Sequence, residues 1–224
     1  MLRMLIGTTA LSLLVCTAAR AQPSPRLFVG AAAGISTLSA DARSEITPAG
    51  ADVSLYQPEN GPALNLLVGV HIHDYVTVQA NYVWNRNEVA LTSVRANDAG
   101  LAFYEQPRTA SQHAIVGDLL VYFRERRSAV RPYLSVGLGV VRLQTTNAGE
   151  SRVRNAALPP PNTQSTRPLL RVAVGIDVSL GLGWRARYSF SESVSGNPIG
   201  AQLSPQGQRG LANFQNLFGV LRAF

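Results

Sequence analysis

The feature that most constrains this chain is a set of short segments in which apolar residues alternate with small or polar residues. The segment 169–180 displays it most clearly. Its even-numbered residues, from Leu170 to Leu180, are all aliphatic, whereas its odd-numbered residues include Arg171, Gly175 and Asp177. A period of two is the side-chain period of a β-strand, and a helix does not produce it. The pattern therefore predicts an all-β chain.

Eight segments carry this alternation, and most are about ten residues long, the length of a tilted strand that crosses a bilayer. They are 27–36, 64–73, 76–85, 114–123, 133–140, 169–180, 184–191 and 214–224. In the last segment, Asn216 and Arg222 interrupt the face formed by Phe214, Phe218 and Phe224. A long arginine near a strand end can reach the polar headgroups, so we interpret all eight segments as strands.

The connections between these segments are alternately long and short. Long polar stretches cover 38–61, 86–109, 144–167 and 192–210, and the tight connections lie around Asp74, 124–130 and 181–183. This alternation is typical of an antiparallel barrel with long loops on one side of a membrane. Hydrocarbon offers no partner to the backbone groups of an open sheet edge, so a membrane-spanning sheet has to close. We predict an eight-stranded antiparallel up-and-down transmembrane β-barrel.

Aromatic residues of the outward face fall near the ends of the predicted strands. Trp84 and Phe190 lie toward the long connections, and Phe123, Trp184 and Phe224 lie toward the short ones. Aromatic girdles at both membrane interfaces are a property of transmembrane barrels. We therefore expect these residues to be interfacial.

The first 21 residues have the organisation of a cleaved export signal, and residues 22–224 form the predicted barrel domain. A short basic start, Met1–Arg3, precedes the apolar run Leu5–Val15 and the small-x-small site Ala19–Ala21. The apolar run is short for a retained membrane anchor, which needs about 20 residues. The other alternative is a lipoprotein signal at Cys16, but Val15 stands where a small residue is expected.

Composition excludes several classes of function. All 20 basic residues are arginine, and with 13 acidic residues they give a formal net charge of +7 that is spread along the chain. Nothing in this distribution indicates nucleic-acid binding. The one cysteine lies in the export signal. The mature chain therefore has no disulfide, no thiolate metal site and no cysteine nucleophile.

The inward side chains of an eight-stranded barrel fill its narrow bore. The predicted inward face is rich in glycine and carries five charged residues: Asp118, Arg171, Asp177, Arg185 and Arg187. Unpaired, each buried charge would cost several kcal/mol, so we predict a structural ion-pair network that plugs the lumen. The tight connection at 181–183 should bring Asp177 beside Arg185 and Arg187. The alternative is a gate, in which rearranged ion pairs open a small pore.

Two further groups of polar residues raise functional alternatives. His71 and His73 are expected in the lumen near its short-turn end, but no third metal ligand lies near them in the sequence, so we expect structural histidines. Ser111 and His113 share the outward face at the long-connection end of their strand, where a lipid-hydrolysing pair could act. No acidic residue of matching phase lies near them, so we predict that the protein is not an enzyme.

Three features occur together in the predicted barrel: the terminal Phe224 on an alternating strand, the run 117–123 (GDLLVYF) and the run 131–139 (RPYLSVGLG). Together they resemble the outer-membrane β-barrel domain family, the small eight-stranded barrels of the OmpA-membrane-domain and OmpX type. The resemblance implies a bacterial outer-membrane location. It also implies that the barrel-assembly machinery reads Phe224 together with Val220 and Phe218. Arg222 departs from the alternating apolar pattern of that signal.

These observations predict an integral outer-membrane protein with a structural or surface-interaction role and no cofactor. Its four long loops would meet the outside, where Arg152 and Arg154 of the third could contact lipopolysaccharide phosphates. Membrane lipid is the other expected partner, and we expect a monomer. The alternatives are a small gated pore and a soluble exported barrel or sandwich, in which the apolar faces would point inward.

Overall fold

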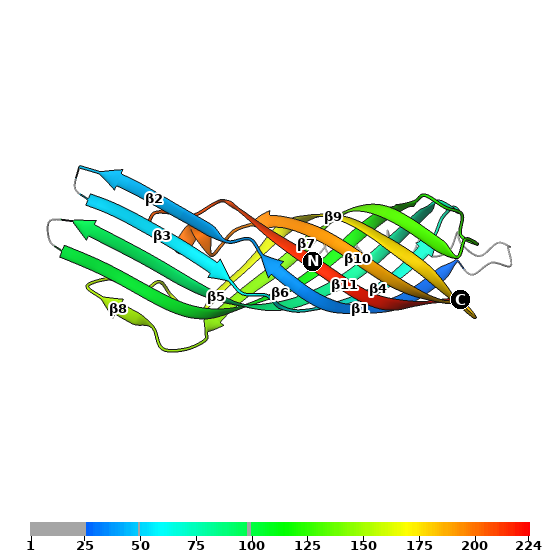
Figure 1. Ribbon diagram of the computed structural model, residues 1–224, viewed down its shortest axis with the longest axis horizontal. Coiled ribbons are helices and arrows are strands. Elements are labelled where there is room, and N and C mark those ends of the chain that lie inside the picture. Colours follow the sequence, from blue (N-terminus) through cyan, green and yellow to red (C-terminus); the bar gives the residue numbers. More distant parts are fainter. Residues whose placement is uncertain (1–25, 49, 98–99) are drawn as a thin grey trace, which may run out of the picture.

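Eight strands of the computed structural model form a closed antiparallel ring. The structure describes residues 26–48, 50–97 and 100–224. In order around the ring, the strands are β1 (Leu27–Leu38), β4 (Gly61–His71), β5 (Val76–Asn97), β6 (Gly100–Tyr122), β7 (Val130–Asn147), β9 (Thr163–Gly181), β10 (Trp184–Gly196) and β11 (Gly210–Ala223). Pairing between β1 and β11, from Phe28 opposite Ala223 to Leu38 opposite Asn213, closes it (Figure 1).

Each ring strand contains all or most of one of the eight segments predicted from alternation, so the predicted barrel is confirmed. Every neighbouring pair of strands in the ring is antiparallel. The short connections lie where the sequence predicts them, at 72–75, 123–129 and 182–183. In the described part of the chain, no helix is long and apolar enough to cross a membrane. The predicted export signal lies outside the described residues.

The prediction of four long loops is wrong in part, because much of that sequence is strand. β5 and β6 stay paired beyond the ring up to Asn97 opposite Gly100. The hairpin of β2 (Asp41–Thr47) and β3 (Gly50–Pro58) pairs with the end of β5, and β8 (Arg152–Arg154) pairs with β6. The result is a five-stranded sheet, β2-β3-β5-β6-β8, that projects beyond the barrel at the left of Figure 1. We call it the extension sheet.

A switch of phase along β5 explains why the sequence prediction ended there. Up to Trp84 the outward residues are apolar, whereas beyond it Arg86 and Glu88 face outward and the apolar Val89 and Leu91 are buried on the other face. Because the apolar residues change to the other face here, the alternating pattern that predicts the strand stops at this point. The backbone pairing continues across it without a shift.

One face of the extension sheet packs on a hydrophobic core that it shares with the adjoining ends of ring strands. Residues 197–208, which make up nearly all of the connection from β10 to β11 and include the short helix η1 (Gly200–Gln202), cover this face; we call them the covering segment. The buried cluster contains Leu38, Tyr56, Val89, Leu91, Tyr104, Ala110, Leu143, Ile199, Leu203 and Leu211. Ser93 Oγ also donates a hydrogen bond to the Ser204 carbonyl, at 2.9 Å. The extension sheet is therefore packed structure rather than loop.

The two faces of the barrel wall differ in the direction that a membrane requires. The outward Val172 and Val174 are 46% and 49% exposed, whereas the inward Arg171 and Asp177 are 3% and 1% exposed. Apolar outside and charged inside is the arrangement of a transmembrane barrel. It is the reverse of the soluble barrel or sandwich considered as an alternative.

The narrow ring leaves no space for side chains at some inward positions. A Cβ on Gly175 would lie 2.4 Å from the Tyr133 hydroxyl oxygen and 2.5 Å from the Tyr188 carbonyl oxygen. By contrast, a Cβ on the outward Gly117 would meet nothing nearer than the Leu138 carbonyl oxygen, at 4.0 Å. The bore is therefore packed against glycine, whereas the outer surface is open at Gly117.

We predict that Gly175→Val prevents barrel formation, whereas Gly117→Val does not. Overpacking costs about 1–3 kcal/mol, and here a backbone oxygen that cannot move aside without breaking strand pairing adds to the cost. The measurement is the fraction of refolded protein that migrates as the compact form on an unboiled gel. Equal folded fractions for the two variants would contradict a lumen packed in this way.

Candidate functional site

An ion pair between β9 and β10 lies at the centre of the lower lumen, toward the short turns. Their register places Arg187 opposite Asp177. The guanidinium donates two hydrogen bonds to the carboxylate, from Nε to Oδ1 at 2.6 Å and from Nη2 to Oδ2 at 2.8 Å. Tyr122 donates its hydroxyl to Asp177 Oδ2 at 2.8 Å, and Arg187 Nη1 donates to Gln79 Oε1 at 2.6 Å. Four strands are thus joined across the bore.

Arg131 closes the short-turn end of this network. Its guanidinium carbon lies 3.7 Å from the centre of the Tyr122 ring, and the residue is 0% exposed. Arg131 Nη2 donates to the Asp74 carbonyl at 2.7 Å, which ties the β4–β5 turn to β7. The stacked cation and ring lie between the lower lumen and the turns.

A second ion pair crosses the middle of the lumen. Arg171 Nη1 lies 3.2 Å from Asp118 Oδ2, which also accepts a hydrogen bond from Asn81 Nδ2 at 2.9 Å. The cavity lined by Asp118, Arg171 and Arg187 has a volume of only about 10 Å³. That volume is about the minimum needed for one water molecule. The lumen therefore holds no continuous passage at this level.

The upper lumen is closed by neutral groups. Asn213 Nδ2 donates to Asn85 Oδ1 at 3.1 Å and to Gln112 Oε1 at 2.9 Å, and Ser36 Oγ donates to Asn213 Oδ1 at 2.8 Å. Beyond this layer comes the hydrophobic cluster under the covering segment. The bore is sealed in three successive layers, two of them ionic.

Arg185 does not join this network, so its predicted place beside Asp177 is wrong. Because Arg187 is opposite Asp177, Arg185, two residues nearer the turn, is opposite Ser179. Its guanidinium donates instead to the backbone carbonyls of Arg126, at 2.6 Å, and Ser128, at 3.4 Å. Arg185 thus holds the β6–β7 turn.

Several members of the network do not follow from the charge pattern of the sequence: Gln79, Asn81, Tyr122, Arg131 and Tyr133, whose ring centre lies 4.9 Å from the Arg187 guanidinium carbon. All except Arg131 stood in the predicted inward phase, and extending segment 133–140 by two residues would have placed Arg131 there as well. Charge identifies only the ionised residues within the predicted strands, and the neutral members of the network carry none. The signal that could have found the others is a polar or aromatic residue in the inward phase.

We predict that Arg187→Gln destabilises the folded barrel by about 3–5 kcal/mol, because it leaves the buried Asp177 without its cation. The double variant with Asp177→Asn should recover part of this loss. Arg152→Gln is the matched control, since Arg152 forms an exposed ion pair with Glu105, 3.4 Å apart, whose loss should cost less than about 1 kcal/mol. Urea unfolding in lipid vesicles measures all three. Equal midpoints for Arg187→Gln and Arg152→Gln would contradict the prediction.

The two histidines occupy different environments. His71 is buried in the lumen, with Nδ1 2.6 Å from Thr77 Oγ1 and its ring 5.0 Å from that of Phe28. His73, expected in the lumen too, lies exposed in the β4–β5 turn and stacks on Tyr75, because the strand ends at His71. No group of three or more metal-ligating side chains occurs among the described residues.

The aromatic and carboxyl-terminal residues singled out in the sequence lie on the outer surface. Phe123 and Trp184 are exposed at the short-turn end, and Phe190 and the half-buried Trp84 lie toward the other end. Phe218, Val220 and Phe224 are exposed as well. The Phe224 N–H donates to the Leu27 carbonyl at 2.9 Å, so the last residue is tied to the first strand. Arg222 places its guanidinium 5.2 Å from the Trp184 ring centre.

Ser111 and His113 lie outward near the extension-sheet end of β6. His113 Nδ1 lies 2.7 Å from the Tyr82 hydroxyl, so its described side-chain partner is a phenol rather than a carboxylate. Opposite His113 on the neighbouring strands are Trp84 and Arg142. A nucleophile, base and acid are not assembled among these residues.

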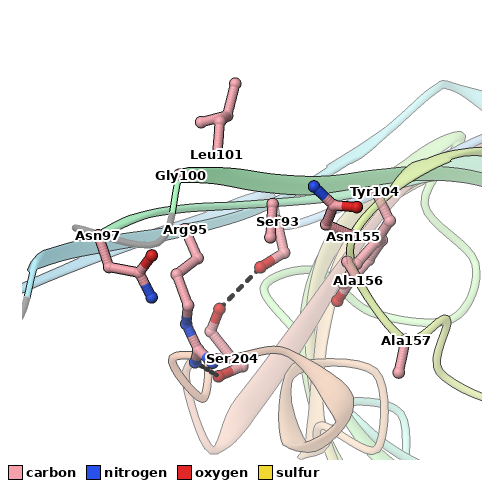
Figure 2. Close-up of a pocket in the computed structure, with 11 residues that line it drawn as sticks. Ser93, Arg95, Asn97, Gly100, Leu101, Tyr104, Asn155, Ala156, Ala157 and Ser204 are labelled. Atoms are coloured by element: carbon pink, nitrogen blue, oxygen red, sulfur yellow. Dashed lines mark hydrogen bonds between the residues drawn. The ribbon is translucent and has the colours of Figure 1, made fainter.

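An open pocket of about 430 Å³ lies at the tip of the extension sheet. Figure 2 shows Ser93 and Arg95 of β5 pointing toward Ser204 of the covering segment. Arg95 also forms a bidentate pair with Asp52 at 2.8–3.0 Å, and these hydrogen bonds hold the pKa of the Asp52 carboxyl below its usual value. Both residues are solvent-exposed, so the pair orients the strands but stabilises them little.

We predict that Ile199→Asp detaches the covering segment and makes β5 and β6 sensitive to trypsin at Arg95 and Arg108, while the barrel stays folded. Burying a carboxylate in the cluster costs roughly 2 kcal/mol or more, so cleavage should accelerate about tenfold or more. Ile46→Asp is the control, because Ile46 is 85% exposed. Cleavage is followed by mass spectrometry of the reconstituted protein. Equal cleavage rates in the two variants would show that the segment does not support the sheet.

Comparisons with known proteins agree with this architecture. The family model for the outer membrane protein beta-barrel domain matches residues 7–209. The crystal structure of Neisserial surface protein A superposes with a TM-score of 0.52 at 16% identity, covering 91% of this chain and 100% of that one. OprG from Pseudomonas aeruginosa gives a TM-score of 0.50 at 12% identity, covering 90% and 97%. No curated protein matches the chain significantly. The structural likenesses concern the fold alone.

Proposed function

Because the chain belongs to the outer membrane protein beta-barrel domain family, we propose that it is a sealed outer-membrane anchor for an external interaction surface. The location in the bacterial outer membrane and the eight-stranded ring follow from the family and the fold. The observation that carries the proposal is a contrast. The lumen is filled in three layers, whereas the extension sheet projects beyond the ring and is packed on a hydrophobic core.

A channel role is disfavoured by the way the lumen is filled. Opening a path would break the Asp177–Arg187 and Asp118–Arg171 pairs and leave buried charges unpartnered. Each broken pair would cost several kcal/mol. It would also require the hydrophobic cluster above them to separate. The filled lumen supports a structural plug over a gate.

The outward face beyond the membrane band supports contact with lipopolysaccharide. Arg86 and Arg142 lie on β5 and β7, and Arg152 and Arg154 lie farther out on β8, opposite Glu105 and Phe103. Guanidinium groups bind phosphate oxygens through paired hydrogen bonds. We infer that this face meets the phosphorylated sugars that surround an outer-membrane barrel.

Biogenesis supplies a second inferred partner. Phe218 and Val220 on the last strand and Phe224 directly after it are exposed apolar residues, with Arg222 between Val220 and Phe224. We infer that the barrel-assembly machinery reads these apolar residues, as the family resemblance implies. We infer no catalytic role, because Ser111 and His113 have no carboxylate among their described side-chain partners. The ring closes with its own strands, which is consistent with a monomer.

We predict that the purified protein does not conduct ions in planar lipid bilayers between acidic and neutral pH. The reason is the continuous filling of the lumen by ion pairs, amides and the hydrophobic cluster. The measurement is single-channel recording of protein whose unboiled gel migration shows it to be folded, compared with protein-free bilayers. Discrete openings that respond to pH would overturn the sealed anchor and revive the gated pore.

A further inference from the structure

The lipid-facing surface of the barrel carries an apolar depression of about 410 Å³ over β4, β5 and β6. Its lining includes the small residue Ala80, which is opposite Gly117 on β6 in a row of larger outward residues. Leu66, Val68, Tyr82 and Ile115 line its sides. We call this depression the slot. An acyl chain is the neighbour that the bilayer offers to such a surface.

Basic side chains lie directly beyond the slot, toward the extension sheet. The Tyr82 hydroxyl lies 2.7 Å from His113 Nδ1, and His113 is opposite Arg142 on β7. Arg86 on β5 is opposite Ser111, the next outward residue beyond His113 on β6. We call Arg86, His113 and Arg142 the basic cluster. Tyr82 belongs to the slot wall and also contacts the cluster, so the two features form one continuous surface.

The cluster presents unneutralised positive charge. Within the described chain, neither Arg86 nor Arg142 forms an ion pair, and the Arg142 guanidinium lies 3.0–3.2 Å from the Gln144 amide group. The nearest outward carboxylate on β5, Glu88, lies one outward position farther from the slot. At the corresponding end of β10, on the other side of the ring, the outward residue is Glu192. Positive charge at the membrane edge is thus gathered above the slot.

We propose that the slot and the basic cluster together bind one molecule of lipid A, the phosphorylated and multiply acylated glycolipid of the outer leaflet. One acyl chain lies in the slot, and the phosphates lie on Arg86, His113 and Arg142. Arg86 and Arg142 stand two strands apart, about 10 Å across the sheet, so they suit a headgroup that carries more than one phosphate. This inference rests on the proposed outer-membrane function and assigns a site to its lipopolysaccharide contact.

The test uses Trp84 as a reporter, because it lies opposite His113. The chain has two tryptophans, so a Trp184→Phe background leaves Trp84 alone. The folded protein in detergent micelles is titrated with bisphosphorylated lipid A, and the emission of Trp84 is recorded. We expect a saturable change whose apparent affinity falls roughly tenfold or more in the double variant R86Q/R142Q, which loses charge-assisted hydrogen bonds to phosphate.

A slot variant and matched controls separate the two halves of the site. Gly117→Leu places a bulky side chain beside Ala80 of the slot, and a Cβ on Gly117 comes no nearer than 4.0 Å to its surroundings, so the variant should fold and its affinity should fall by a similar factor. R127Q/R209Q removes the same charge from exposed residues outside the cluster, and Ala186→Leu enlarges an outward residue of β10; neither should alter the affinity. Unboiled gel migration verifies that every variant is folded.

Three results would overturn the site. Equal responses to phosphatidylglycerol or inorganic phosphate would mean general anion attraction, and an unchanged affinity in Gly117→Leu would mean that the slot holds no chain. If R152Q/R154Q loses the response while the cluster and slot variants keep it, this site fails but the broader lipopolysaccharide contact stands. If no variant, including the parent, responds to lipid A, both inferences fail.

Discussion

The requirement that every backbone N–H and C=O within hydrocarbon has a partner determines the rest of this structure. An open sheet cannot meet it, so the last strand pairs with the first along its whole length, from Phe28 to Leu38. Closure with eight strands makes the bore narrow. The narrow bore in turn requires glycine at positions such as Gly175, where no Cβ fits, and brings side chains from opposite walls into contact. Filling and closure are thus two consequences of one constraint.

This constraint no longer applies outside the membrane, and there the sheet is open instead of closed. In water an open sheet edge is solvated, so the extension sheet ends at β2 and β8 without closing. It cannot rely on hydrocarbon to cover an apolar outer face, and it places its apolar residues on the inner face under the covering segment. The extension sheet therefore does not have to close into a second ring. It needs only the covering segment between β10 and β11.

Much of the barrel could be predicted from the sequence, because alternation is a local property. All eight ring strands follow from it, and the tight connection at 181–183 correctly indicates that Asp177 and Arg187 lie close together. The exact partners could not be predicted in this way, since the register shift between Trp184 and Arg185 decides that Arg187 is opposite Asp177 and Arg185 is opposite Ser179. The contacts of Tyr122 and Arg131 depend on which strands face each other across the bore. That information is not local, so a strand-by-strand analysis does not contain it.

The extension sheet was missed for a different physical reason, and that reason locates the membrane edge. Along β5 the outward residues change from Val78 and Tyr82 to Arg86 and Glu88, while the inner ones change from Gln79 and Asn81 to Val89. A strand that passes from hydrocarbon into water must exchange the composition of its two faces, because the solvent on its outer side changes. The exchange occurs just beyond Trp84 and His113, which are opposite each other in the pairing of β5 with β6. The basic cluster thus lies at the boundary that the phase switch marks, where headgroup phosphates are found, and the slot lies on its hydrocarbon side.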